Sequence, residues 1–149
     1  MHQLNLPEYD YKVKREHNKE YIFDVIRKKY LVLTPEEWVR QHVVSFLINH
    51  KHFPKSFIVI EKGLVFNEMQ KRADVLIYNQ QLQPLFLVEC KAPHIKISEA
   101  TFEQIARYNM VFKVPYLLVT NGMNHYCCKI DFENESYTFL EDIPDYELL

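Results

Sequence analysis

The sequence predicts a single α/β domain in which a helix, an antiparallel meander of three strands, a second helix and a fourth strand follow in order, with extra strands at both ends. Two segments begin with helix-capping residues, and short runs rich in Val, Ile, Leu and Phe lie between and after them. The 149 residues are 48% hydrophobic and include only 2 glycines, which suits one packed core without a flexible linker. We therefore expect one domain over 1–149, made of an N-terminal strand extension (1–33), a core (34–122) and a C-terminal hairpin and tail (123–149).

The first helix is predicted over 35–50. Thr34 can cap its N-terminus, Pro35 suits the first helical position, and the two acids that follow are favoured by the positive end of the helix dipole. Trp38 most simply packs in the core beneath this helix. Before it, residues 19–33 alternate charged residues with aromatic and branched ones, which predicts one or two strands.

The meander is predicted over 57–62, 73–78 and 85–91, because each of these is a short apolar run bounded by polar or Pro-containing turns. After the second helix, further apolar runs predict a buried strand and a terminal hairpin. These cover 116–120, which ends at the Asn121-Gly122 turn, and the hairpin strands 125–132 and 136–140.

Ser98 can cap the second helix, which begins at Glu99. The helix should stop before Pro115, since the residue preceding a proline resists the helical region. Its inner face is expected to consist of Phe102, Ile105 and either Val111 or Phe112.

Several classes of protein are disfavoured by the composition. No apolar segment reaches the roughly 18 residues of a membrane span, and the first ten residues lack the pattern of a signal peptide, so we expect a cytoplasmic protein without membrane contact. The odd number of cysteines, three, favours reduced and buried thiols over a disulfide framework. Two of them, Cys127 and Cys128, are adjacent and should therefore lie on opposite faces of a strand. The 7 histidines lack the paired spacing of a zinc site.

Three charged residues lie inside the buried strand runs: Asp74, Glu89 and Lys91. An ionised side chain removed from water without a partner costs several kcal/mol. The three must therefore neutralise one another, as in a structural salt-bridge network, or hold a cation.

The expected hairpin geometry favours a cation. If 80–83 form a four-residue loop, Asn79 opposes Pro84 and, five residues further back, Asp74 opposes Glu89. Opposed side chains have Cβ atoms about 4.5–5.5 Å apart, close enough to share one divalent ion.

The chemistry of this arrangement suits a phosphodiester. Two carboxylates and the backbone carbonyl of Cys90 offer the oxygen ligands that Mg²⁺ prefers, with Mn²⁺ as an alternative occupant. Lys91 lies on the same strand face as Glu89 and could stabilise a hydroxide or the charge on a phosphate.

These residues carry a resemblance. Asp74 followed by Glu89-Cys90-Lys91, in the predicted element order, resembles the PD-(D/E)xK nuclease superfamily and its restriction-endonuclease-like core. The segments TPEEWVRQ, KRADVLIYN, LFLVECKAP, EQIARYN and VTNG are most similar to the N-terminal endonuclease domain of type I restriction enzyme R subunits.

The resemblance implies a magnesium-dependent endonuclease acting on DNA, with 5′-phosphate products. It implies Asp74 and Glu89 as metal ligands and Lys91 as the catalytic lysine. An acid of the first helix often joins such a site, and we choose Glu37 over Glu36, although both acids could simply cap the helix.

DNA contacts are expected on the second helix and just before it. Gln104 and Tyr108, one turn apart, match a Q-x-x-x-Y element that lies beside the active site in some nuclease branches. Lys96 and Arg107 are candidate phosphate contacts. The alternative for these four residues is that they are ordinary surface side chains without a role in DNA binding.

The net charge of −2 gives no overall attraction to nucleic acid, so DNA would have to be held by a local basic surface and bound metal. The first thirty residues are rich in such charges, although a solvated face is an equally good interpretation. R subunits continue into helicase domains, and these 149 residues contain no glycine-rich phosphate loop. Helicase or specificity subunits are therefore expected as partners, a homodimer stays open, and the main rival hypothesis is a non-catalytic DNA-binding or assembly module. The basic residues in question are Lys12, Lys14, Arg15, Lys19, Arg27, Lys28 and Lys29.

Overall fold

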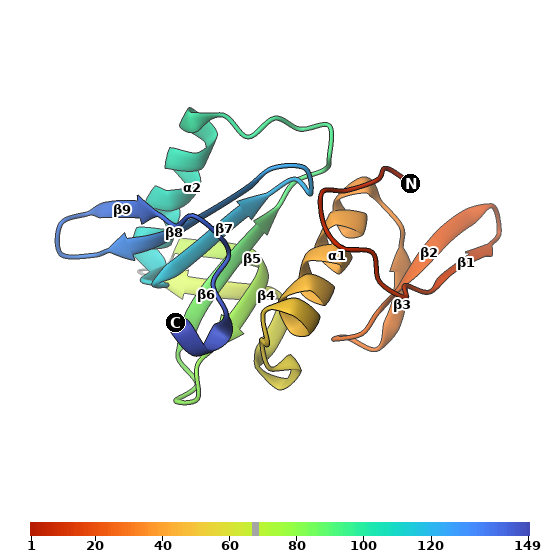
Figure 1. Ribbon diagram of the computed structural model, residues 1–149, viewed down its shortest axis with the longest axis horizontal. Helices are drawn as coiled ribbons and strands as arrows, with labels where there is room; N and C mark the ends of the chain where they lie inside the picture. The colour runs from red at the N-terminus through yellow and green to blue at the C-terminus, as the bar shows by residue number, and fades with distance from the viewer. Residues whose placement is uncertain (67–68) are drawn as a thin grey trace.

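The computed structural model describes the backbone of residues 1–66 and 69–149, and the side chains outside 61–73. A six-stranded sheet forms the centre of the molecule, with helix α1 (Pro35–His50) on one face and helix α2 (Glu99–Phe112) on the other (Figure 1). A second sheet of three strands lies beyond α1. The α/β class predicted from the sequence is confirmed. None of the described helices has the length and apolar character that a membrane span requires.

The central sheet has the order β4-β5-β6-β7-β8-β9. All neighbours pair antiparallel except β6 and β7, which are parallel and are connected through α2, as a crossover between parallel strands requires. The strands β4 and β5 run further than the predicted 57–62 and 73–78, because their backbone pairing continues beyond the apolar runs. The strands are β4 (Ile58–Phe66), β5 (Met69–Tyr78), β6 (Pro84–Cys90), β7 (Tyr116–Thr120), β8 (His125–Asp131) and β9 (Ser136–Phe139).

Helix α1 occupies the predicted range. The Thr34 hydroxyl accepts a hydrogen bond from the Glu37 backbone N–H at 3.0 Å, which satisfies one of the free donors of the first turn. Trp38 is buried as expected, and its indole N–H donates to the carbonyl of His2 at 2.7 Å. This bond ties the N-terminal segment to the helix.

Helix α2 begins at the predicted residue, with the Ser98 hydroxyl accepting from the Thr101 N–H. Phe102 and Ile105 are buried as predicted, and Phe112 packs against the same cluster while partly buried. Ala106 and Asn109 are further buried positions that were not predicted. The polar Asn109 is tolerated there because its amide donates to the Val114 carbonyl at 2.8 Å, where the chain leaves the helix.

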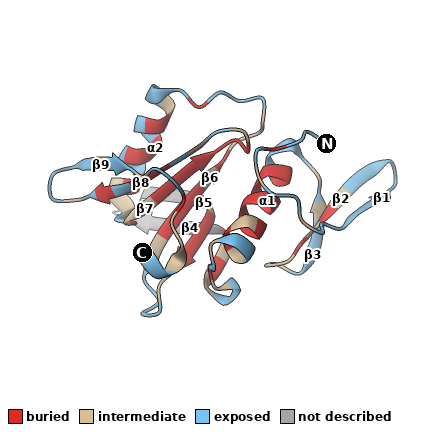
Figure 2. Ribbon diagram, viewed as in Figure 1, coloured by how far each residue is buried: buried red, intermediate tan, exposed pale blue. Residues whose placement is uncertain are grey.

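Strands β6 and β7 and the described part of β5, residues 74–78, are buried on both faces, and alternate side chains enter two hydrophobic clusters (Figure 2). Val75 and Val88 pack in the cluster under α1, whereas Leu76 and Leu87 pack in the cluster under α2. The adjacent Cys127 and Cys128 enter opposite clusters in the same way, and all three cysteines are free and buried. Both cysteine predictions are confirmed.

The range 19–33 forms two strands, as predicted: β2 (Lys19–Asp24) and β3 (Lys29–Val32). A further strand that was not predicted, β1 (Val13–Glu16), precedes them and pairs with β2. The sequence signal for the first turn is weak, because it contains His-Asn in place of the usual Asn-Gly. His17 and Asn18 nevertheless both adopt positive φ, 50° and 64°, which two-residue hairpin turns of this kind require. The resulting sheet projects from the α1 side of the molecule (Figure 1).

The β5–β6 hairpin corrects the predicted register. Pro84 pairs with Tyr78 and not with Asn79, and a register shift follows between Ile77 and Tyr78. The Asn79 side chain accepts from two backbone N–H groups of the loop, so that the loop takes one more residue than predicted. The register shift compensates for the extra loop residue, so that Val75 pairs with Val88, the pairing that a four-residue loop without a shift also predicts.

Candidate active site

The predicted strand charges lie where β5 and β6 approach the first turns of α1. Val75 pairs with Val88, and one step further along both antiparallel strands stand Asp74 and Glu89. Lys91 directly follows β6, and its backbone N–H donates to the Thr120 carbonyl at 2.8 Å. The pairing with β7 thus holds the end of β6 in place beyond Cys90.

The Asp74 carboxylate takes part in the sheet itself. Its Oδ2 accepts a hydrogen bond from the Cys90 backbone N–H at 2.7 Å. The carboxylate thus takes the place of a backbone carbonyl as the acceptor for the Cys90 N–H. This bond positions Asp74 against the end of β6, next to Glu89 and Lys91.

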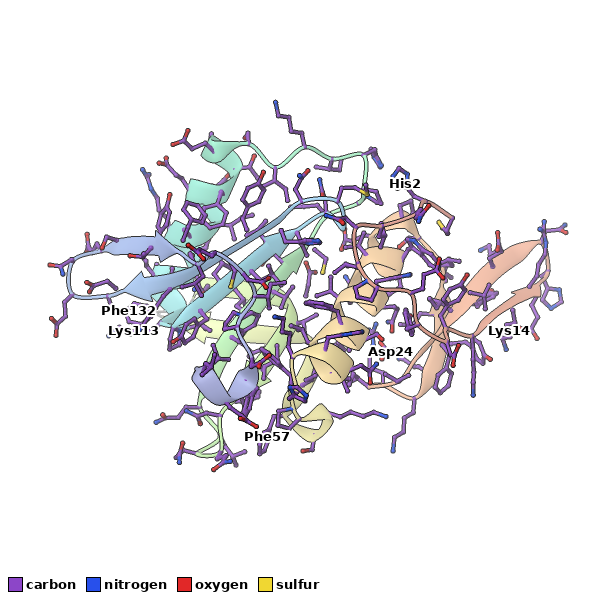
Figure 3. The ribbon with its side chains drawn as sticks, in the orientation of Figure 1. His2, Lys14, Asp24, Phe57, Lys113 and Phe132 are labelled. Atoms are coloured by element: carbon purple, nitrogen blue, oxygen red, sulfur yellow. The ribbon has the colours of Figure 1, made fainter. Side chains whose placement is uncertain are left out.

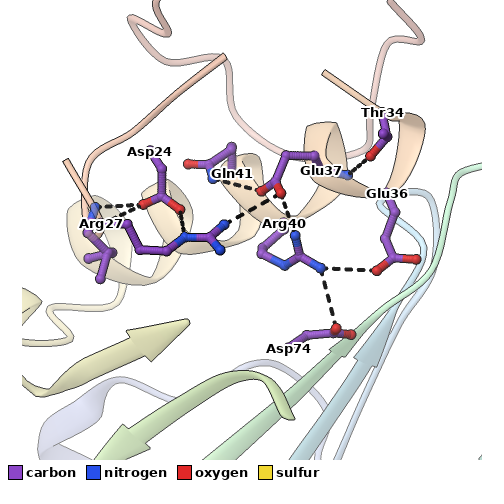
Figure 4. Close-up of polar contacts among 9 residues, drawn as sticks. Asp24, Arg27, Thr34, Glu36, Glu37, Arg40, Gln41 and Asp74 are labelled. Carbon is purple, nitrogen blue, oxygen red and sulfur yellow. Dashed lines mark hydrogen bonds and ion pairs between the residues drawn. The ribbon is translucent and has the colours of Figure 1, made fainter. Parts of the chain in front are cut away.

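Arg40 is a member of the site that the sequence analysis missed. Its guanidinium lies 2.6 Å from Glu37 Oε1, 3.0 Å from Glu36 Oε1 and 3.3 Å from Asp74 Oδ1 (Figure 4). The Arg40 side chain is only 5% exposed, so these carboxylates neutralise a charge that is nearly out of water. The spacing to Glu36 and Glu37, four and three residues along one helix, is the signal that could have revealed it.

The two first-helix acids, of which Glu37 was predicted to join the site, have different surroundings. Glu37 is buried, and its two oxygens accept from Arg40 and from the Gln41 amide at 2.6 and 2.9 Å. Glu36 has a side chain that is 47% exposed and contacts the other side of the guanidinium (Figure 4). One residue turns a helix by about 100°, so the two acids reach the Arg40 guanidinium from different directions and differ in exposure.

Electrostatics also connects Glu36 to the strand charges. Burial raises the pKa of the Glu36 carboxyl and the negative charge of Asp74 raises it further, while Arg40 and Lys91 act in the opposite direction. The net pKa is raised. Glu36 is thus the first-helix acid whose pKa responds to the charges of Asp74 and Lys91.

The Cys90 thiol is not available as a ligand. It is buried in the cluster under α1, and burial, followed by the negative charge of Asp74, raises the pKa of the thiol well above its usual value. Metal coordination by cysteine requires the thiolate. Of Cys90, only the backbone carbonyl remains as a donor, as predicted from the sequence.

The described residues fit a magnesium ion held mainly by water. No group of three or more His, Cys, Asp or Glu side chains suited to a metal ion occurs in the part of the chain that the structure describes. Mg²⁺ commonly uses one or two carboxylates and keeps several waters. The carboxylates of Asp74 and Glu89 and the Cys90 carbonyl are oxygen donors of the kind that Mg²⁺ prefers.

The candidate DNA contacts of α2 gather on one exposed face. Gln104, Arg107 and Tyr108 line an open groove of about 390 Å³ along the helix. Lys96 is exposed in the segment between β6 and α2 and is not among the described residues that line this groove. The structure thus brings three of the four predicted contacts together.

The comparisons with known proteins agree with this fold. The family model for the type I restriction enzyme R protein N terminus (HSDR_N) matches residues 35–144. No curated protein matches the chain. A solved fragment of a protein assigned as an HsdR subunit of a type I restriction enzyme, from Vibrio vulnificus YJ016, has 21% sequence identity and a TM-score of 0.51 over 75% of this chain. A protein assigned as a nuclease of DUF820 from Anabaena variabilis ATCC 29413 covers 92% of this chain, and this chain covers 80% of it, at 10% identity and a TM-score of 0.49.

The extent of these matches defines what they support. This chain spans 24% of the length of the Vibrio vulnificus protein, so that the likeness concerns one region of a larger molecule. The family match covers most of the chain, from the start of α1 to beyond β9. The chain belongs to the family of type I restriction enzyme R protein N-terminal domains.

Proposed function

We propose that this domain is a metal-dependent endonuclease that hydrolyses phosphodiester bonds in DNA. The observation that carries the proposal is the hydrogen bond from the Cys90 backbone N–H to the Asp74 carboxylate at 2.7 Å, which places Asp74 against the end of β6, where Glu89 precedes and Lys91 follows Cys90. Family membership supports the same activity.

Asp74 and Glu89 are the proposed ligands of Mg²⁺ or Mn²⁺, with the Cys90 carbonyl as a further oxygen. The bound ion supplies Lewis-acid polarisation of the phosphate and an activated water. The hydrogen bond from the Cys90 N–H to Asp74 keeps one carboxylate fixed in position, which reduces the cost of assembling the site when DNA binds.

The cationic residues have separate proposed roles. Lys91 neutralises the negative charge that develops on the phosphate oxygens during attack. Arg40 contacts Asp74 and Glu36, so it limits the repulsion between carboxylates that lie close together. Glu36, in place of Glu37, is the proposed first-helix acid of the site.

DNA is proposed to lie along the exposed face of α2. Gln104, Arg107 and Tyr108 line one groove there, and a groove with an amide, a guanidinium and an aromatic ring can contact both phosphates and bases. Lys96 is a separate proposed phosphate contact. Helicase or specificity subunits are the proposed partners, in keeping with the family, and the proposed compartment is the cytoplasm.

Plasmid nicking and calorimetric Mg²⁺ or Mn²⁺ binding, measured on the same preparations, test the proposal. Asp74→Ala and Glu89→Ala should lose both properties. Lys91→Met should bind the metal normally and nick DNA at least about 100-fold more slowly, a loss typical of removing one electrostatic stabiliser. Metal binding without nicking by the wild-type chain, alone and with the partner subunits, would favour the non-catalytic module.

A further inference from the structure

The three-stranded N-terminal sheet lies outside the family match, which begins at residue 35. It is also the most basic part of the chain. Between residues 11 and 33 there are seven lysines and arginines against three acids, a net charge of +4 in a chain whose total is −2. The sheet therefore carries a local charge opposite to that of the whole molecule.

The two faces of this sheet are different. Ile22 and Asp24 lie on the inward face and are fully buried, and Ile22 packs in the hydrophobic cluster under α1. Because side chains alternate along a strand, the residues between them lie on the opposite, outward face. The register places these residues side by side on the outward face: Lys12, Lys14, Glu16, Lys19, Tyr21, Phe23, Tyr30 and Val32.

The outward face combines ammonium groups with aromatic rings. Lys14 Nζ lies 4.3 Å from the centre of the Tyr30 ring, and Lys12 Nζ lies 5.7 Å from that of Phe23. The Phe23 and Tyr30 rings pack edge to face at 5.2 Å. Tyr30 is 36% exposed, so the ring is reachable from solvent.

The base of the sheet is attached to the candidate active site by alternating charges. Arg27, in the β2–β3 turn, donates to Asp24 at 2.7 Å and lies 3.5 Å from Glu37. Glu37 binds Arg40, and Arg40 contacts Asp74 (Figure 4). The sheet is thus held against the helix whose first turn lies at the site.

We propose that the outward face of β1–β3 binds a DNA strand, with its lysines on the phosphates and the Tyr30 ring beneath an unpaired base. Lysines that neutralise phosphates and rings that stack on bases are the two elements of single-strand recognition. Among the outward-face residues named above, the one acid is Glu16, which lies 3.5 Å from Lys14. Such an exposed pair contributes little. The choice of DNA as the nucleic acid rests on the proposed function. The basic charge and the aromatic rings of this face are independent of that function.

Two triple variants of equal charge change test this surface. Lys12→Gln/Lys14→Gln/Lys19→Gln neutralises the outward face. Lys55→Gln/Lys113→Gln/Lys129→Gln removes the same charge from exposed positions on the main body of the domain. Lys113, for example, lies far from β1–β3 in Figure 3. Both should unfold at the wild-type temperature.

Binding is measured by fluorescence anisotropy with a labelled single strand and with a duplex of the same length, in EDTA to prevent cleavage. The first triple variant should bind about ten-fold or more weakly, and its duplex-binding slope against log salt should fall by about two to three, since each phosphate contact contributes about 0.9. The control triple should remain near the wild-type values. Tyr30→Leu should weaken single-strand binding roughly ten-fold and leave duplex binding unchanged.

Equal losses in the two triples would overturn the proposal, because net charge alone would then explain the binding. Wild-type affinity in the first triple would also overturn it, as would a wild-type chain that binds neither oligonucleotide. An unaffected Tyr30→Leu variant would contradict the stacking contact. The nicking assay separates this inference from the proposed activity: a chain that binds DNA through this face but never nicks it would refute only the activity.

Discussion

The Arg40 guanidinium lies 3.3 Å from the Asp74 carboxylate and links the first helix to β5. The same carboxylate accepts the Cys90 N–H of β6, so a single aspartate connects three elements. Because Arg40 also binds Glu36 and Glu37, the charges of this region stabilise the fold and form the candidate site together.

Replacement of Arg40 by glutamine should destabilise the protein. The substitution leaves the buried Glu37 without its 2.6 Å partner, and breaking a buried ion pair by removing one member costs about 3–5 kcal/mol. Urea unfolding in EDTA measures the loss. Arg107→Gln, on the exposed groove of α2, is the control and should change stability by less than about 0.5 kcal/mol. An unchanged Arg40→Gln variant would show that the pair is not maintained in solution.

Glu36→Gln and Glu37→Gln should have contrasting effects, and each serves as the control for the other. The charges of Asp74 and Lys91 act on the pKa of Glu36, whose side chain is 47% exposed. If Glu36 belongs to the proposed site, its variant should keep its stability and bind Mg²⁺ about 10–100-fold more weakly. Glu37 is buried between Arg40 and Gln41, so its variant should lose about 3 kcal/mol of stability. Calorimetry and urea unfolding separate the two. The reverse result would restore Glu37 as the acid of the site.

Asp24 should make the stability of the protein depend on acid pH. Burial alone would raise the pKa of its carboxyl, but hydrogen bonds from Arg27 and Ile26 outweigh burial and lower it below the usual 3.8. The stabilisation is therefore complete above about pH 4 and is lost as the pH falls through the lower, folded-state pKa. Asp24→Asn should cost about 1–3 kcal/mol near neutral pH. The difference from wild type should shrink in acid when unfolding is followed from pH 7 to pH 2, and a constant difference would contradict the assignment.

Gly122→Ala should destabilise the turn after β7. Gly122 has φ of +85°, and an added Cβ would lie 2.8 Å from Leu4 Cδ2. Together the backbone strain and the contact should cost about 1–3 kcal/mol. The double variant Gly122→Ala/Leu4→Ala distinguishes them by thermal unfolding. It should be less destabilised than the sum of the single variants if the contact contributes, and simple additivity would leave the backbone as the sole cause.

The sequence by itself determined both helices and most of the strands, although β1 was not predicted. Local signals sufficed for α1, where Thr34 and Pro35 mark the start, and for β7, whose predicted and observed bounds coincide. The opposite facing of Cys127 and Cys128 also followed from the alternation of a strand. The ends of α2 were predictable as well, but Asn109 on its inner face was not, because its burial depends on a contact with Val114 after the helix.

The tertiary structure decided which charges meet. Glu36 and Glu37 both suit the first turn of a helix, and both lie within four residues of Arg40. What distinguishes them is burial, because Glu37 is buried in the packed structure whereas the Glu36 side chain stays 47% exposed. Packing also brings Arg40 to Asp74, across 34 residues of sequence. The β5–β6 register needed both a shift and a longer loop, whose effects cancel at Val75. Propensity and periodicity act within a few residues of the chain, whereas contacts between distant charges depend on how the finished elements pack.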